Sequence, residues 1–357
     1  MPLYMDIHTV HGGATVDGIA QAHAADLKAQ GAHDVRYLRY WVSEAQGKIF
    51  CLVDAPSAEA ANTVHREAHG LVADDVFEVQ EGLSLTITTP APDGGRRPVL
   101  VWLHGGGYGT GAGSLDWYDR ASLAREGDVV VVGVNYRLGP LGYLSCAGLG
   151  DGQMGLRDMI AAIGWVSAHI ASFGGDPGEI TLMGQSAGAH SALCLLAMPD
   201  VRRLFRRVIL QSAPADIAPF PKAQAAAWSR RYLSVLGLTG LPHGRLAQQL
   251  LSAEPAALLE AAGTLARDNA RLGQVEPPFF PVADELADPG AFLGAAARGA
   301  AAGNVQVIIG TNRDEARAIV AANPDAKRAG RAQVDAYLQA TLDASAARRY
   351  RRRLFAA

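Results

Sequence analysis

The sequence Gly184-Gln185-Ser186-Ala187-Gly188 places a serine between two glycines, each two residues away from it. The residues before it read as a strand and those after it as a helix, which predicts that Ser186 occupies a sharp strand-to-helix turn. The glycines permit the tight turn, and the head of the helix favours developing negative charge at the hydroxyl. Ser186 is therefore a candidate nucleophile, although G-x-S-x-G alone also describes an ordinary turn serine.

A glycine-rich loop, His104-Gly105-Gly106-Gly107, follows a second expected strand. Without a Cβ in the way, backbone N–H groups of such a loop can approach the oxyanion of a tetrahedral intermediate. A glycine turn without a catalytic role is the alternative. Further along, Asp314 and Glu315 follow a later strand, where the acid of a serine-based triad is expected; a surface acidic pair is the alternative there.

Histidines near the N-terminus form a second group with chemical potential. His65 and His69 are four residues apart on an expected helix, so both rings project from one face and could share a metal ion. His8 on a strand and His23 on another helix could complete the cluster, and imidazoles suit nickel or zinc. Because two ligands alone do not make a site, capping or surface histidines are the alternative interpretation.

The first segment, residues 1–80, is expected to position these histidines. Its hydrophobic periods predict strand, helix, strand, strand, helix, strand, the pattern of a small ferredoxin-like α+β domain. One face of its sheet lacks helices; Tyr37, Tyr40 and Trp41 could help to cover it, and a homodimer through this face is expected. The expected elements are Leu3–Ile7, Val16–Gln30, Val35–Val42, Ile49–Val53, Ala58–Ala68 and Val76–Val79.

The second segment, residues 81–357, alternates strands with longer helices. This pattern predicts an α/β fold, a mostly parallel sheet with helices on both faces. The expected strands are Leu83–Thr88, Val99–Leu103, Val129–Asn135, Ile180–Gly184, Val208–Gln211 and Val305–Gly310. The expected helices are Trp117–Arg125, Leu156–Ser172, Ala187–Ala197 and Lys222–Leu236, with a helical insertion over 241–293.

Longer stretches around these motifs resemble the type-B carboxylesterases and cholinesterases, members of the α/β-hydrolase fold. The matching strings, in the family's order, are GGDPGEITLMGQSAGAHSA, PVLVWLHGGGYGTGAGS, GDVVVVGVNYRLGPLGYLS, GQMGLRDMIAAIGWV and LFRRVILQSA. The resemblance implies Ser186 as nucleophile, and Gly106, Gly107 and Ala187 as oxyanion donors. It also implies Glu315 as the acid and Ser212 as the residue that supports this carboxylate. Ala316 replaces the glycine that usually follows the acid.

The first segment resembles a family of small bacterial proteins, some of which bind nickel. The matching stretches are RYLRYWVSE, KIFCLVDAP and VHREAHG. This resemblance favours a nickel or zinc site in the first domain. The ester chemistry itself requires no cofactor.

A catalytic base is the component that the sequence does not supply. In the carboxylesterase family it is a histidine well after the acid, whereas the last histidine here is His243. The esterase is therefore expected to be truncated at both ends, and possible impairment of its activity follows. His190 is the nearest substitute, one helical turn beyond Ser186, while His104 lies in the glycine loop and His169 at a helix end.

Composition narrows the function classes. The 357 residues are 49% hydrophobic and 19% charged, with a net charge of -3, so neither nucleic acid nor an anionic membrane is an expected partner. Three cysteines cannot all pair, which favours a reducing compartment, and no signal peptide is recognisable, so a cytoplasmic protein is expected.

Three interpretations stay open on the sequence alone. The chain is a serine esterase acting through an acyl-enzyme on a small, uncharged ester; or a non-catalytic α/β-hydrolase scaffold; or a metal-binding protein with a relic esterase segment. Each predicts a different result, namely serine-dependent turnover, binding without turnover, or metal uptake by the first domain.

Overall fold

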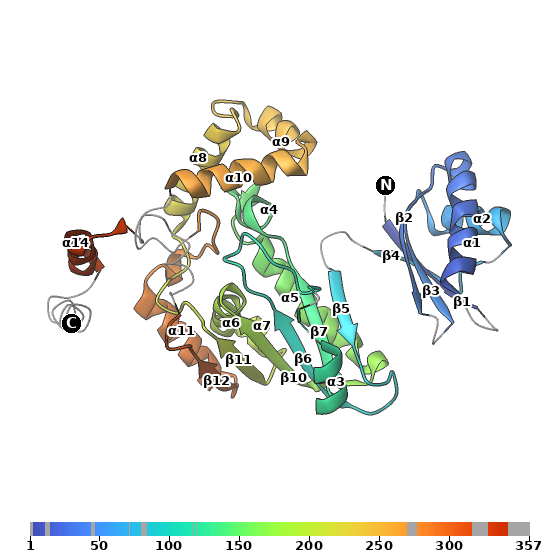
Figure 1. The fold of residues 1–357 in the computed structure, drawn as a ribbon, viewed down its shortest axis with the longest axis horizontal. Coiled ribbons are helices and arrows are strands. Elements are labelled where there is room, and N and C mark those ends of the chain that lie inside the picture. The colour runs from blue at the N-terminus through green and yellow to red at the C-terminus, as the bar shows by residue number, and fades with distance from the viewer. Residues whose placement is uncertain are drawn as a thin grey trace. The chain divides into compact units, whose positions relative to one another are not determined.

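The computed structural model describes residues 3–10, 15–43, 47–70, 72–79, 84–115, 117–118, 120–269, 277–315 and 328–341. The chain divides into two compact units, Met1–Gly82 and Leu83–Ala357. Each unit has its own hydrophobic core. The two are therefore described separately (Figure 1).

The first unit is a four-stranded antiparallel sheet with two helices. Its strands run in the order β2-β3-β1-β4, which is the split βαβ arrangement that the sequence predicted. Both helices begin at a capped residue, since Thr15 accepts from the Gly18 N–H and Ser57 from the Ala60 N–H. The elements are β1 Leu3–Thr9, α1 Val16–Ala29, η1 Gln30–His33, β2 Arg36–Ser43, β3 Lys48–Asp54, α2 Ala58–Ala68 and β4 Asp75–Val79.

Alternation along the strands sorts the side chains of this unit onto two faces. Asp6 and His8 on β1 are buried, as are Ile49, Cys51 and Val53 on β3. Residues between them are only half-buried, and on the open face they form two cross-strand pairs, Met5 with Leu52 and Ile7 with Phe50. The open face is therefore apolar.

The expectation that Tyr37 and Tyr40 cover the open face is wrong. Tyr37 is buried and donates its hydroxyl to the Ala61 carbonyl of α2, and the Tyr40 ring lies 4.4 Å from His23 of α1. A register shift between Tyr37 and Arg39 adds a residue to β2, so two positions three apart share one face. The Trp41 side chain lies outside the described residues.

The second unit is built on a six-stranded sheet in the order β12-β11-β10-β6-β7-β5. All neighbours are parallel except β5, which runs antiparallel to β7. The mostly parallel sheet predicted from sequence is thus confirmed. Its strands are β5 Ser84–Thr88, β6 Arg97–Leu103, β7 Val130–Asn135, β10 Gly175–Gln185, β11 Arg207–Gln211 and β12 Gln306–Gly310, and β8 Ser145–Cys146 pairs separately with β9 Gly150–Asp151.

Helices cover this sheet, and the backbones of α11 and α6 pack against each other. A Cβ on Gly299 of α11 would lie 1.9 Å from the Leu196 carbonyl oxygen of α6, so only glycine fits there. The helical elements are α3 Arg120–Gly127, α4 Gly139–Tyr143, α5 Met154–His169, η3 Ile170–Phe173, α6 Ala187–Ala197, α7 Pro199–Arg202, α8 Lys222–Val235, α9 His243–Ser252, α10 Pro255–Asn269, η4 Asp284–Leu286, α11 Pro289–Ala302 and α14 Arg331–Thr341.

A helical layer of α8, α9 and α10 gathers at one end of the second unit (Figure 1). Its apolar residues form one buried cluster with Tyr108 and Ala187, which follow β6 and β10. The layer therefore packs near the carboxyl ends of the parallel strands, where α/β proteins place their functional residues.

His190 links helix α6 to this layer. Its ring is fully buried, accepts at Nδ1 from the Tyr108 hydroxyl at 2.7 Å and donates from Nε2 to the Ile217 carbonyl at 2.8 Å. Both ring nitrogens are thus engaged in the neutral tautomer. Burial lowers the pKa of His190 from 6.5 to about 4.

None of the described helices combines the length and the apolar character that a membrane span needs.

We expect acid to destabilise the second unit through His190. Between pH 6.5 and about 4 the unfolded chain protonates this imidazole and the folded chain does not, so stability falls as pH falls. The loss reaches about 3 kcal/mol by pH 4. His190→Gln, though less stable at pH 7, should lose less on acidification, as measured by urea unfolding followed through tryptophan fluorescence.

The exposed His169 supplies the matched control, and His169→Gln should keep the wild-type dependence on pH. Four of the five tryptophans, Trp102, Trp117, Trp165 and Trp228, report on the second unit. Equal acid sensitivity of His190→Gln and the wild-type chain would contradict the prediction.

Candidate active site and buried histidine cluster

Ser186 occupies a strained turn between β10 and α6. Its backbone has φ 54° and ψ −118°, a conformation that side-chain-bearing residues rarely adopt. The Ser186 N–H donates to the Gln211 carbonyl of β11 at 2.9 Å, and the His190 N–H donates to the Ser186 carbonyl at 2.9 Å. The backbone thus holds the turn, and among the described residues none forms a hydrogen bond with the Ser186 hydroxyl.

Two glycines make the turn sterically feasible. A Cβ on Gly184 would lie 2.4 Å from the Gly188 carbonyl carbon, and a Cβ on Gly188 would lie 2.1 Å from the Leu103 carbonyl oxygen. A Cβ atom essentially never comes this close to a non-bonded atom. The first turn of α6 therefore packs directly on the end of β6 only because both residues are glycine.

The glycine loop after β6 lies against the same turn. A Cβ on Gly105 would be 2.2 Å from the Gln185 side-chain oxygen, next to Ser186 in the chain. Gly106 and Gly107 have φ of 122° and 61° and are exposed, whereas Ala187 is buried at the start of α6. The structure therefore brings the loop that carries Gly106 and Gly107 to the turn that carries Ser186 and Ala187.

Glu315 follows the end of β12, the strand that pairs with β11. Its carboxylate accepts from the Asn312 N–H at 2.6 Å. The Ser212 hydroxyl, followed by that N–H, lowers the pKa of Glu315, so the exposed carboxylate is ionised near neutral pH. Ser212 has a positive φ of 51° and donates its N–H to the Gly310 carbonyl at 2.8 Å.

The ends of three neighbouring strands thus carry the predicted residues. Ser186 follows β10 and is bonded to Gln211, Ser212 follows Gln211 on β11, and Glu315 follows β12. Because these strands are parallel, their carboxyl ends meet at one edge of the sheet.

Three of the described histidines of this unit, His104, His169 and His190, make no hydrogen bond to the Ser186 hydroxyl in this conformation. His190 has both nitrogens engaged, as described above. His104 is buried, its Nδ1 donates to the Gly105 carbonyl at 2.8 Å and its ring stacks on Tyr136. Burial lowers the pKa of His104, and its Nε2 has no hydrogen-bond partner among the described residues. His169 is exposed at the end of α5, where it packs against Trp165.

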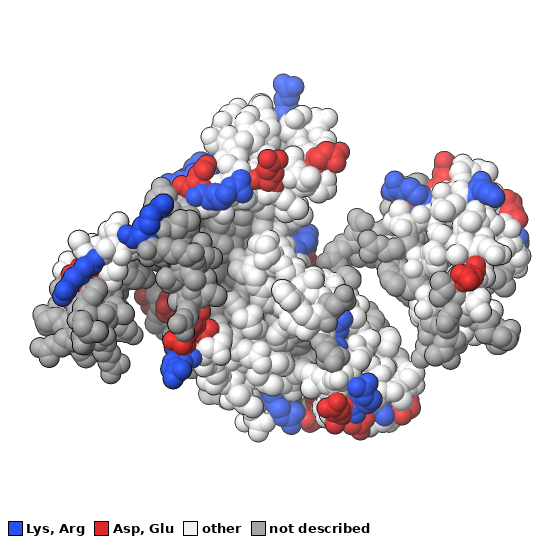
Figure 2. Space-filling model, viewed as in Figure 1, with Lys and Arg blue, Asp and Glu red and all other residues white. Residues whose placement is uncertain are grey.

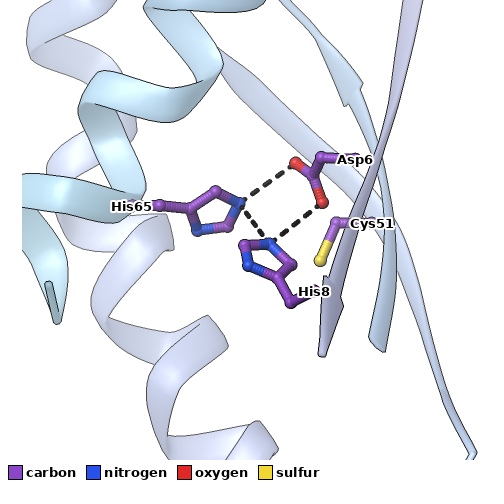
Figure 3. A group of neighbouring side chains, drawn as sticks. All are labelled: Asp6, His8, Cys51 and His65. Carbon is purple, nitrogen blue, oxygen red and sulfur yellow. Dashed lines mark hydrogen bonds and ion pairs between the residues drawn. The ribbon is translucent and has the colours of Figure 1, made fainter. Parts of the chain in front are cut away.

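Three of the four predicted N-terminal histidines meet in the first unit, centred on His65 of α2. Its Nε2 lies 3.2 Å from the His8 Nε2 and 3.0 Å from an Asp6 carboxylate oxygen. Its Nδ1 lies 3.0 Å from an Asp26 oxygen and 3.3 Å from the His69 Nε2. Figure 3 shows Asp6, His8 and Cys51 directed from the sheet toward His65. Asp6, His8, Cys51 and His65 are all buried.

His23 lies beside this group rather than within it. Its ring packs on Tyr40 and lines a cavity of about 20 Å³ next to His65 and His69. His69 also closes α2 as its C-cap residue, with its N–H bonded to the His65 carbonyl. Thus the capping interpretation applies in part to His69, while His8 and His65 are buried and not surface residues.

Three acidic or thiol groups of the cluster were missed from sequence, namely Asp6, Asp26 and Cys51. Asp6 and His8 alternate on β1 and so share its inner face, and Asp6 is the direct cross-strand neighbour of Cys51. The i, i+2 spacing of Asp6 and His8 could have predicted that they share a face of β1. The sequence gives no such indication for Asp26, because its position depends on how α1 packs against α2.

Buried charge dominates the electrostatics of the cluster. Burial alone would lower the pKa of His65, but hydrogen bonds to Asp26 and Asp6 outweigh it and raise the pKa to about 9. Burial would likewise raise the pKa of Asp6, but hydrogen bonds from His65 and His8 bring it below its usual value. Burial, followed by Asp6, raises the pKa of the Cys51 thiol, which is therefore protonated.

Comparison with known proteins identifies both parts of the chain. Residues 48–355 match the model of the carboxylesterase family, and residues 4–79 match that of the nickel responsive protein SCO4226-like. The first match begins at Lys48, the first residue of β3, although β3 and β4 both pair with β1 in the sheet of the first unit. The first unit is therefore assigned to the second model.

Curated relatives include phenmedipham hydrolase of Pseudarthrobacter oxydans, 37% identical over 79% of this chain and 54% of its own length. Para-nitrobenzyl esterase of Bacillus subtilis is 37% identical over 74% of this chain and 51% of its own length. The crystal structure of carboxylesterase EST55 of Geobacillus stearothermophilus superimposes with a TM-score of 0.60 at 35% identity, over 72% of this chain and 54% of that one. The chain spans about half the length of these relatives and belongs to the carboxylesterase family.

Proposed function

We propose that the second unit is a serine carboxylic-ester hydrolase that acts through an acyl-enzyme. The observation that carries the proposal is the strained turn at Ser186 with the glycine loop packed against it. A strained serine with an unengaged hydroxyl beside exposed backbone donors is the arrangement that acyl transfer requires.

In the proposed reaction the Ser186 hydroxyl oxygen attacks the ester carbonyl while its proton passes to a base. The N–H groups of Gly106, Gly107 and Ala187 would stabilise the oxyanion that forms. Collapse of this intermediate breaks the bond to the alcohol, which leaves with the proton, and the acyl group remains on Ser186. Water then repeats the sequence, so that the carboxylic acid leaves and the serine is regenerated.

Proton transfer from Ser186 is the step that we expect to limit the rate. Among the described residues no imidazole forms a hydrogen bond with the hydroxyl. Glu315, ionised and held near Ser212, is the group suited to orient a base. Removal of the base in a comparable triad lowers turnover on the order of 10⁶-fold.

The substrate is proposed to be a small uncharged ester. Ala187 belongs to an apolar buried cluster with Tyr108 and Phe280, which supports a ligand of low polarity. The related proteins are named as hydrolases or esterases. A non-catalytic scaffold that binds such a ligand without turnover is the alternative, and a relic segment beside a metal-binding unit is a second one.

Serine-dependent ester hydrolysis is the direct test. Purified chain should release p-nitrophenol from p-nitrophenyl acetate slowly, and added imidazole should accelerate the release by acting as an external base. Ser186→Ala should show only the reaction of imidazole in solution. Ser172→Ala, which removes an exposed hydroxyl, should behave like the wild-type chain.

Identical rates for the wild-type chain and Ser186→Ala, with and without imidazole, would reject catalysis in favour of the scaffold. Far-UV circular dichroism of each variant confirms that the comparison is between folded proteins.

A second candidate function is metal binding by the first unit. The specific observation in its favour is the buried group of Asp6, His8, Cys51 and His65, whose ligand atoms all lie within 4.8 Å of one another. Nickel or zinc is the proposed ion, because imidazole and thiol donors suit both. The ester hydrolysis proposed above requires no cofactor.

Equilibrium dialysis should find one Ni²⁺ or Zn²⁺ bound per chain. His65→Ala should abolish this binding, whereas His169→Gln, far along the chain in an exposed position, should not affect it. If the wild-type chain retains no metal after dialysis, the proposal that the first unit binds a metal ion is wrong.

We also propose a cytoplasmic homodimer without nucleic acid or membrane partners. The apolar open face of the first unit, with Met5 and Phe50, supports association of two copies. The three cysteines are free, which suits a reducing compartment. On the face drawn in Figure 2 charges of both signs are scattered over the described residues without a broad basic patch, which supports the absence of a nucleic-acid partner.

A further inference from the structure

We propose that Asp6, His8, Cys51 and His65 together ligate one divalent transition-metal ion, and that Asp26 positions His65 from outside this set. The inference rests on the metal binding proposed above and names the residues responsible. It replaces the cluster of four histidines expected from sequence with a mixed set that includes a carboxylate and the Cys51 thiol, which releases its proton to solvent when it binds the ion as a thiolate.

The separations of the donor atoms fit a single ion. The His8 Nε2 and His65 Nε2 are 3.2 Å apart, the His65 Nε2 and Asp6 Oδ2 are 3.0 Å apart, and the His8 Nε2 and Asp6 Oδ1 are 3.3 Å apart. Metal–ligand bonds of about 2.0–2.3 Å in a tetrahedron place donor atoms roughly 3.3–3.7 Å apart. These three atoms therefore need to separate only slightly to accept an ion, and the Cys51 Sγ lies within 4.8 Å of the other ligand atoms.

The hydrogen bonds of the cluster are incomplete without an ion. Two imidazole Nε2 atoms face each other, and only one of them can donate to the other. The His8 Nδ1 and the Asp6 Oδ1 are buried and have no hydrogen-bond partner among the described residues. Since buried polar atoms normally find partners, the orphaned Asp6 Oδ1, 3.3 Å from the His8 Nε2, indicates a missing component that a cation between Asp6, His8 and His65 supplies, whereas the His8 Nδ1 would keep the proton of the ligating imidazole.

Asp26 is arranged to orient one ligand rather than to bind the ion. Its Oδ1 lies 3.0 Å from the His65 Nδ1, which leaves the His65 Nε2 directed at Asp6 and His8. A carboxylate that accepts the second ring N–H of a ligating histidine fixes its tautomer and orientation. A second ion among Asp26, His65 and His69 would require the same Nδ1 to lose its proton, so we assign His69 to supporting Asp26, 3.0 Å away.

Cys51 determines which ions the site accepts. It faces Asp6 across the β1–β3 pair, and a thiolate with two imidazoles selects nickel, zinc or cobalt over magnesium, calcium or manganese. All four ligands are buried, and the adjoining cavity of about 20 Å³ holds no more than a water molecule. A site with four buried protein ligands and so little space beside them resembles a structural metal site and leaves no room for an organic substrate.

The decisive experiment titrates the full chain with Co²⁺ and, separately, with Ni²⁺. Thiolate ligation should give a near-ultraviolet charge-transfer band that saturates at one ion per chain. Cys51→Ser should lose the band and bind at least tenfold more weakly. Asp26→Asn should keep the band but weaken binding by roughly 10–100-fold. His33→Gln, which changes a partly exposed histidine paired with Glu67, should match the wild-type chain.

Two results would overturn the ligand assignment while leaving metal binding intact: a band that persists in Cys51→Ser, or His69→Gln weakening Ni²⁺ binding as much as His8→Gln does. Failure of the wild-type chain to bind either ion would reject metal binding itself. Because Cys51→Ser disturbs a buried position, circular dichroism and thermal melting of the metal-free variants check folding. His8→Gln, which leaves Cys51 unchanged, gives an independent test by weakening binding without abolishing the band at saturation.

Discussion

The close approach of two backbone segments at Gly188 is the constraint on which the second unit depends. With no Cβ at this position, the first turn of α6 rests on the Leu103 carbonyl at the end of β6. The same contact places the glycine loop after β6 beside Ser186. A single steric requirement thus fixes both the helix that begins at Ala187 and the position of the glycine loop beside the serine.

The carboxyl ends of β10, β11 and β12 extend this arrangement. The hydrogen bond from the Ser186 N–H to Gln211 couples the turn to β11, and Ser212 couples β11 to Glu315. Parallel pairing keeps these ends in register, so that Ser212 and Glu315, more than a hundred positions apart in sequence, meet through a side-chain hydrogen bond. The proposed hydrolase site depends on the sheet, whereas the proposed metal site depends on the packing of α2 onto a sheet face.

This difference explains how much could be predicted from sequence. Period and glycine spacing predicted the strands, the turn at Ser186 and the loop at Gly106, because these are local patterns with a local physical cause. The side of β2 on which Tyr40 lies could not be predicted, since a bulge shifted its register. Asp26 contacts His65 only because α1 packs against α2, and the spacing of residues in the sequence does not indicate how two helices pack. His190 is neutral because it is buried, and the Ile217 carbonyl that its Nε2 bonds lies 27 residues away in the sequence.

The Ser186 turn is held by its backbone and its flanking glycines, and its side chain takes no part. Chemistry and folding at this position are consequently separable in evolution. A change at the hydroxyl can silence catalysis while the turn, the helix and the sheet persist, and a later change can restore it. A lineage built on this turn can move between enzyme and binding protein through single substitutions, with little selection from stability in either direction.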